Sequence, residues 1–215
     1  VLGLGVGGAF TSKQRKEWIN AGVDPRHRAD RLEAIVSLVK GLTRGEVISH
    51  RGRHFDLDDV SIQPVSPQDD GVPILLACHW QAGLDRQWQR AGKQGDGFIS
   101  ISDSPEEYGK MSSKVRGYAE SAGRDFDAME AAFYMTVNLR SNPAIAAEEA
   151  NAFLMRYYGA NIWGDRWGPF GPPELTVNRI REYSESGAGT IIVRFASFDQ
   201  EEQMKIFLRD VVPPF

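Results

Sequence analysis

The 215 residues are 41% hydrophobic and 25% charged, which is the balance of an ordinary soluble globular chain. The formal net charge of −4 argues against a broad surface for nucleic acid or anionic membrane, and we expect neither a membrane span nor a signal peptide. Cys78 is the only cysteine in the sequence, which excludes an intrachain disulfide and a cysteine-rich metal site. We therefore expect a single domain over residues 1–215, in the cytoplasm.

The first segment, VLGLGVGG over residues 1–8, has the pattern of an apolar strand and contains G-x-G-x-x-G. A dinucleotide-binding site would require a helix directly after this motif and then a second strand that ends in an acidic residue. Asp24 and Asp30 instead lie at the start of, or inside, a helical pattern. We therefore favour another interpretation of this segment over a dinucleotide site: its glycines let a flat ring approach the strand backbone closely. Because the chain begins inside this strand, we expect that further residues precede it.

A helix is predicted to start at Asp24 and Pro25, with the aspartate as N-cap, and to end at Gly41 or Gly45. Its apolar residues recur at helical spacing: Leu32, Ile35, Val36, Val39 and Leu42. Two short strand-like pieces follow, at residues 54–57 and 61–65. We interpret them as a β-excursion on the surface.

Residues 72–78 and 98–101 are short apolar runs, which is typical of strands buried on both faces. The roughly twenty residues between them suffice for a crossover helix that buries Trp88 and Ala91. Together they predict one right-handed βαβ unit. In parallel α/β folds, ligands bind beyond the carboxyl ends of the strands. This rule places four residues at the mouth of a site: Ala77, Cys78, His79 and Trp80.

The alternation continues to the end of the chain and predicts a parallel sheet with helices outside it. The predicted segments are a helix from 104 to 123, a strand at 132–139, a helix from 142, an aromatic loop at 161–173, a helix at 173–186, a strand at 190–195 and a last helix from 199. The inner faces of the three helices that begin at 104, 142 and 199 are expected to be Tyr108, Met111, Val115, Tyr118 and Ala122; Ile145, Ala150, Phe153, Leu154 and Tyr157; and Met204, Phe207, Leu208 and Val211.

The candidate site residues each have a structural alternative. His79 either contacts a ligand or caps its own loop, and Cys78 reads as a small buried residue rather than a nucleophile. Trp80 either stacks on a ligand or only packs. Arg194 faces either the site or a salt bridge. The loop that contains Trp163 is a candidate lid or a packed surface loop.

Metal and catalytic residues are not assignable from the sequence. His27, His50 and His54 lack metal-ligand spacing, so we expect no metal site. No residue stands out as a catalytic base.

Several short motifs, in this order and spacing, resemble the luciferase-like flavin monooxygenases, a family that includes bacterial luciferase and deazaflavin-dependent reductases. They are LGLGVGG at 2–8, Glu17 with Gly22, Arg28 with Glu33, RGRHFDL at 51–57, PVSP at 64–67, GDGF at 95–98, GPPE at 171–174, SGAG at 186–189 and VVP at 211–213.

The resemblance implies a TIM (β/α)8 barrel that is incomplete here, comprising roughly the fourth to eighth strand–helix units. Residues 2–8 would be the fourth strand and residues 72–78 the fifth. The family binds its flavin at the carboxyl face, which implies a ring near the first glycines and a phosphate near the loop after the fifth strand, with amides up to Gly83. The implied cofactor-binding residues are Gly5, Val6, Gly7, Ala77, Cys78, His79 and Trp80, and the implied substrate-binding residues are Arg194 and Trp163.

By the same resemblance, we expect an FMN-dependent monooxygenase that acts on a small organic substrate and receives reduced FMN from a separate flavin reductase. One alternative is a hydride-transferring reductase that uses a deazaflavin coenzyme. Another is a non-catalytic barrel subunit. We expect a homodimer or larger assembly. Finally, we predict that Gly5, Gly7, His79 and Trp80 line one cleft, with backbone amides after Trp80 binding phosphate.

Overall fold

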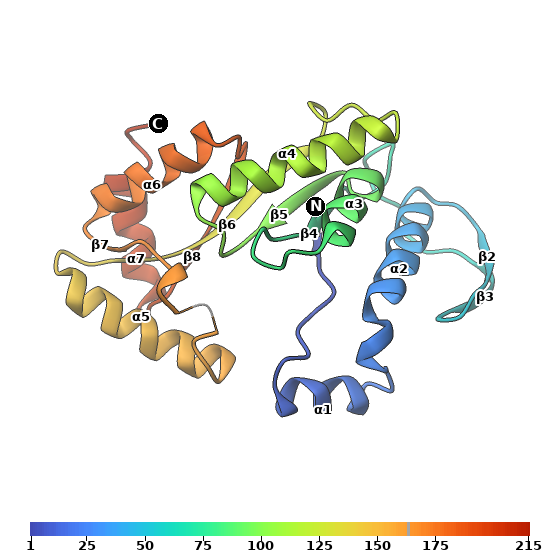
Figure 1. Ribbon diagram of the computed structural model, residues 1–215, viewed down its shortest axis with the longest axis horizontal. Helices are drawn as coiled ribbons and strands as arrows, with labels where there is room; N and C mark the ends of the chain where they lie inside the picture. The colour runs from blue at the N-terminus through green and yellow to red at the C-terminus, as the bar shows by residue number, and fades with distance from the viewer. Residues whose placement is uncertain (163) are drawn as a thin grey trace. The chain divides into compact units, whose positions relative to one another are not determined.

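The computed structural model describes residues 1–162 and 164–215, in which helices and strands largely alternate (Figure 1). The chain divides into two compact units. Unit 1 comprises residues 1–78, 84–98 and 114–130, and unit 2 comprises residues 79–83, 99–113 and 131–215. Strand β5 (Gly97–Ser100) and helix α4 (Pro105–Ser121) each run from one unit into the other. The single domain over residues 1–215 stays a prediction.

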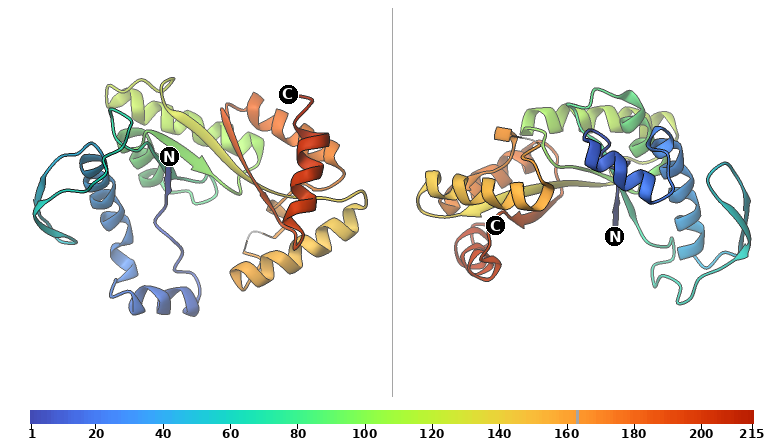
Figure 2. Two further views of the ribbon diagram at one scale, coloured as in Figure 1. Left: turned by 180° about the vertical axis from the view of Figure 1, so that it is seen from behind. Right: turned by 90° about the horizontal axis from the view of Figure 1, so that it is seen from below.

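Unit 1 begins with two parallel strands, β1 (Leu2–Leu4) and β4 (Ile74–Ala77), and β5 is the next strand beside β4. Leu2 lies opposite Ile74, and Leu4 opposite Leu76. The other elements of the unit are α1 (Ser12–Asn20), the short 3-10 helix η1 (Pro25–His27), α2 (Arg28–Thr43), the antiparallel strands β2 (Ile48–Arg51) and β3 (Asp56–Val60), and α3 (Asp85–Gln94). Figure 2 shows the β2–β3 hairpin beside α2.

The burial predicted for the first strand and the helix of the central βαβ unit is confirmed. Ile74, Leu75 and Leu76 of β4 are all buried, as a strand covered on both faces requires. Trp88 and Ala91 of α3 are buried as predicted.

The aspartate of the GDGF motif, Asp96, has a structural role in unit 1. Asp96 accepts a hydrogen bond from the Ile74 amide at 2.9 Å and from Lys40 Nζ at 2.5 Å. The carboxylate therefore joins the start of β4 to α2. Because this is the amino end of the strands, the motif serves stability rather than ligand binding.

Other features of unit 1 differ from the predictions. Helix α1 was not predicted, although Thr11 and Gln14 form a capping box at its start. The surface hairpin occurs, but at residues 48–60 rather than 54–65. Asp24 caps η1 instead of α2 itself. Strand β1 is shorter than the apolar run that predicted it, because the glycines after Leu4 leave the sheet.

Unit 2 is also built on parallel strands. Its central strand β6 (Glu130–Leu139) pairs in parallel with β7 (Phe170–Gly171) and with β8 (Thr190–Phe195), and β5 is its neighbour. The helices are α5 (Pro143–Tyr158), α6 (Pro173–Glu185) and α7 (Gln200–Ile206), with a short 3-10 helix η2 (Gly164–Arg166) and a short π-helix η3 (Phe207–Val211). The predicted parallel arrangement is confirmed in both units.

The predicted inner face of the last helix is correct only in part, because Val211 is fully buried as predicted. Met204 and Leu208 are exposed, whereas Gln203 is fully buried. The Gln203 side chain accepts from the Leu139 amide at 2.6 Å and donates to the Leu139 carbonyl at 3.1 Å. A buried backbone end needs such partners, so this polar residue turns inward.

The predicted inner faces of α4 and α5 are correct only in part. On α5, Ala150 and Leu154 are buried, but Ile145 and Tyr157 are exposed. On α4, the first three predicted positions are buried, whereas Ala122 lies on the surface after the end of the helix.

Candidate functional site

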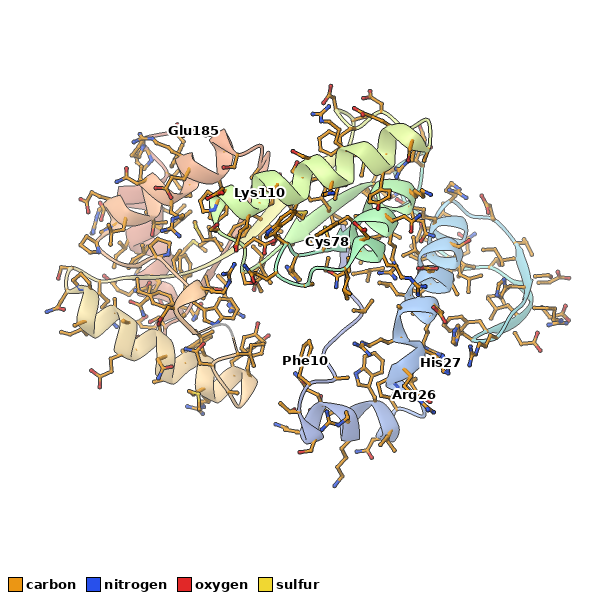
Figure 3. The ribbon with its side chains drawn as sticks, viewed as in Figure 1. Phe10, Arg26, His27, Cys78, Lys110 and Glu185 are labelled. Atoms are coloured by element: carbon orange, nitrogen blue, oxygen red, sulfur yellow. The ribbon has the colours of Figure 1, made fainter. Side chains whose placement is uncertain are left out.

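The carboxyl ends of β1 and β4 lie side by side in unit 1. A side chain added at Gly5, just after β1, would lie 3.1 Å from the Ala77 Cβ at the end of β4. Two segments more than seventy residues apart thus meet where parallel-sheet proteins bind ligands. Cys78, the next residue, is fully buried, in agreement with its prediction as a small buried residue (Figure 3).

The glycines after β1 do allow a flat ring to approach, and that ring belongs to the protein itself. Gly7 has a φ of +69°, and a Cβ there would lie 2.8 Å from the indole of Trp18. The Trp18 indole N–H donates to the Gly8 carbonyl at 2.8 Å. A cavity of about 320 Å³ opens beside this indole and is lined by Gly7, Gly8, Gln14, Glu17, Trp18 and Ala21.

In unit 2, a buried aspartate organises the segment after β4. Asp103, which is 1% exposed and follows β5, accepts from the Trp80 amide at 2.8 Å and from the Ser100 hydroxyl at 2.7 Å. The Gln81 amide points to the other carboxylate oxygen at 3.5 Å. Ser100 Oγ in turn lies 3.3 Å from His79 Nδ1. These contacts form a chain from His79 through Ser100 to Asp103.

A second carboxylate extends this network. Glu107 accepts from the Ser104 amide at 2.8 Å, from the Gln81 side chain and from Arg166. Although burial raises the pKa of Glu107, these hydrogen bonds lower it overall. Arg166 Nε also donates to the Ser102 carbonyl at 2.8 Å. The loop after β4, the end of β5 and the turn at 164–166 are thereby held together.

The sequence predictions missed Ser100, Asp103 and Arg166 in this role. Ser104 and Glu107 entered the predictions only as part of the helix from 104 to 123. The available signal was the position of Ser100 and Asp103 at the carboxyl end of the predicted strand 98–101. Their pairing with His79 and Trp80, more than twenty residues earlier, depends on tertiary structure.

The loop after β4 differs from the expected phosphate site in two ways. Helix α3 begins at Asp85, and its amides do not directly follow Trp80. The Trp80 amide already has the Asp103 carboxylate as acceptor, and the Gly83 amide donates to the Trp80 carbonyl. A phosphate at this strand end would need donors other than these two amides.

We expect His79 to make the folded state sensitive to mild acid. Burial lowers the pKa of its imidazole below the ordinary 6.5, and the Asp103 carboxylate opposes this only in part. The unfolded state therefore takes up a proton first, so stability present above about pH 6.5 should fall as the pH falls below that value. Urea unfolding at several pH values should show this loss, and His79→Gln should reduce it.

The matched control is His50→Gln in the β2–β3 hairpin, which removes an imidazole elsewhere. If His79→Gln leaves the pH dependence between pH 7 and 5 as it is in the wild type, the burial argument for His79 is wrong.

Arg194, the predicted substrate contact on β8, makes no salt bridge with any carboxylate in the described part of the chain. It donates to Thr136 Oγ1 at 2.9 Å and to the Tyr158 hydroxyl at 2.7 Å. The salt-bridge alternative is therefore not seen. Trp163, the other predicted substrate contact, lies outside the described residues.

The predicted cofactor residues fall into both units. Gly5, Val6, Gly7, Ala77 and Cys78 belong to unit 1, whereas His79 and Trp80 belong to unit 2. That they line one cleft stays a prediction. Among residues 1–162 and 164–215, no group of three His, Cys, Asp or Glu side chains could hold a metal ion. Nor does any helix in these ranges have the length and apolarity to cross a membrane.

Comparison with known proteins adds a family match. A family model described as luciferase-like monooxygenase matches residues 1–166. Among curated proteins, an F420-dependent glucose-6-phosphate dehydrogenase from Kribbella flavida is 27% identical over 240 residues, which cover 99% of this chain and 68% of the relative. A dehydrogenase of the same name from Mycolicibacterium gilvum is 24% identical, with the same coverage.

Two solved structures illustrate the similarity in fold. A monooxygenase from Streptomyces bottropensis superposes with a TM-score of 0.76 at 20% identity, over 99% of this chain and 68% of the other. An F420-dependent secondary alcohol dehydrogenase in complex with an F420–acetone adduct gives a TM-score of 0.75 at 18% identity, over 98% of this chain and 68% of the other.

Proposed function

Because this chain belongs to the luciferase-like monooxygenase family and has the fold of an incomplete (β/α)8 barrel, as predicted, we propose that it is part of a deazaflavin-dependent dehydrogenase. The observation that carries this choice is the match, over 99% of the chain, to relatives named F420-dependent dehydrogenases. The sequence analysis expected FMN and named a deazaflavin coenzyme as the alternative. The proposal favours the deazaflavin coenzyme. It keeps a small molecule as the substrate and a homodimer or larger as the assembly.

The residues at the strand ends fit part of such a cofactor. The Trp18 indole gives the cavity a flat wall, and Gln14 and Glu17 line it with hydrogen-bonding groups. Since Glu17 would repel an anion, this cavity suits a neutral part of the cofactor rather than its phosphate. When bound, the deazaflavin would supply the hydride chemistry, and the protein would orient it and exclude water.

His79 and Trp80 have a supporting role in this proposal. Asp103 holds the Trp80 amide and, through Ser100, faces the His79 ring. Burial keeps the pKa of His79 low, so the ring at pH 7 is a neutral hydrogen-bonding group rather than a cation.

A second candidate is an FMN-dependent monooxygenase that takes reduced FMN from a separate reductase. The family description and the fold match to the Streptomyces bottropensis monooxygenase favour it. A non-catalytic barrel subunit is the third alternative that the sequence left open.

Titration of the purified protein with F420 and with FMN, followed by cofactor fluorescence, separates these candidates. We expect F420 to bind more tightly than FMN. His79→Ala and Trp80→Ala should each weaken binding roughly tenfold to a hundredfold, the effect of losing one strong hydrogen bond or stacking contact. Circular dichroism should show that both variants stay folded.

Tighter binding of FMN would favour the monooxygenase, and binding of neither cofactor would count against both enzymes. His50→Ala serves as the control for a histidine outside the site and should bind F420 like the wild type.

A further inference from the structure

Arg194, near the carboxyl end of β8, carries a positive charge that no neighbouring carboxylate balances within the described ranges 1–162 and 164–215. Its Nη2 and Nη1 donate to Thr136 and Tyr158, and both acceptors are neutral hydroxyls. Its Nε is shielded from solvent and has no hydrogen-bond partner among the same residues. A guanidinium has five N–H groups, and the Arg194 side chain also hydrogen-bonds the Tyr134 hydroxyl, so its known partners are all hydroxyls.

Aromatic rings surround this guanidinium. Its central carbon lies 5.0 Å from the ring centre of Trp167, 5.2 Å from Tyr158, 5.3 Å from Tyr134 and 5.4 Å from Tyr157. Ring faces attract a cation, but they carry no net charge. They hold the guanidinium in place and displace water from it without neutralising it.

A half-buried cation of this kind favours an anionic partner, because its attraction to an anion is stronger where water is excluded. The planar fork of arginine matches the two oxygens of a carboxylate or of a phosphate. The position of Arg194 near the carboxyl end of a strand agrees with a ligand site in this fold.

The same rings offer an apolar surface next to the charge. Tyr157 is 65% exposed and Tyr158 is 36% exposed, so their rings are open to solvent although they contact Arg194. Tyr158 and Trp167 are stacked, with ring centres 6.0 Å apart and planes at 17°. A flat molecule that carries one anionic group would contact the charge and the rings together.

We propose that Arg194, with Tyr134, Tyr157, Tyr158 and Trp167, binds the carboxylate of a flat, largely apolar molecule, and that this site sets the substrate class. The assignment of that molecule as the substrate rests on the proposed function, whereas the anion site itself does not. All of these side chains belong to unit 2.

Calorimetric titration of the full chain without cofactor tests the site. Benzoate is the probe, benzamide is its uncharged analogue of similar shape, and inorganic phosphate is an anion without a ring. We expect benzoate to bind more tightly than either. Arg194→Gln should weaken benzoate binding at least about tenfold, as expected for the loss of one charge-assisted hydrogen bond.

Two further variants control the experiment. Arg209→Gln changes an exposed arginine of the same unit that is already paired with Asp210 at 2.6 Å, and it should leave benzoate binding unchanged. Tyr158→Phe keeps the ring but frees an Arg194 N–H, so affinity should not fall. Thermal unfolding of each variant shows whether the fold is retained.

Equal benzoate binding by the wild type and Arg194→Gln would overturn the proposal. The proposal would also be overturned if benzamide or phosphate bound as tightly as benzoate. Absence of any benzoate binding would overturn it as well. If neither F420 nor FMN binds while benzoate still binds through Arg194, the proposed function fails and the anion site stands.

Discussion

Replacing Asp103 by alanine is expected to destabilise the protein more than any other single change at the site, by roughly 3–5 kcal/mol. The buried carboxylate accepts hydrogen bonds from the Trp80 amide and the Ser100 hydroxyl, and alanine would remove this acceptor from both donors. Each buried donor left unsatisfied costs about 1–3 kcal/mol, and the Gln81 amide adds a weaker contribution. Urea unfolding followed by circular dichroism measures the loss.

Asp103→Ala should also weaken cofactor binding, because the segment after β4 would lose the group that positions it. Asp103→Asn keeps the shape and one acceptor oxygen, so it should cost less than alanine. Asp70→Ala, an exposed aspartate of unit 1, is the control for a lost carboxylate. A loss below about 1 kcal/mol for Asp103→Ala would mean that water replaces the carboxylate without penalty.

Glu149→Gln is expected to cost about 2–3 kcal/mol at pH 7. Glu149, on α5, accepts from Arg140 at 2.7 Å, from the Ser197 hydroxyl at 2.5 Å and from the Phe198 amide at 3.3 Å. Burial raises its pKa, but these hydrogen bonds outweigh burial and lower the pKa to about 2 from 4.5. The full shift corresponds to about 3 kcal/mol, and partial exposure reduces this figure.

The pH dependence of this contribution has a defined sign. The folded-state pKa of Glu149 is lower than that of the unfolded chain, so its stabilisation is present above about pH 4.5 and disappears as the pH falls toward 2. Wild type and Glu149→Gln should therefore converge in stability near pH 2. Glu148→Gln, on the exposed side of the same helix, is the control. A constant difference across this range would assign the effect to packing instead of charge.

Glu149 also connects stability to the proposed ligand site. Ser197 and Phe198 directly follow β8, the strand that carries Arg194. If the carboxylate fixes this strand end, Glu149→Gln should loosen the loop but leave the Arg194 side chain in place. Hydrogen exchange at residues 197–199 would detect the loosening.

The sequence by itself determined the class of fold. Apolar runs of the length of β4 and helical periodicity of the kind seen in α2 are local properties, and each can be read without its neighbours. Their strict alternation implied parallel strands, because two parallel strands need a long crossover between them. The family motifs then identified the kind of barrel, and the strand ends located Ala77, Cys78, His79 and Trp80.

Only the tertiary structure decided which side chains complete the site. Asp103 contacts Trp80, and Arg194 contacts Trp167, through pairings that the local sequence does not encode. Gln203 turns inward because the distant Leu139 backbone needs partners, and hydrophobicity alone does not predict a buried glutamine. Local sequence patterns indicate which residues are buried and which are exposed to solvent. They do not indicate which acceptor a buried donor pairs with, because that depends on which strand ends lie together in the tertiary structure.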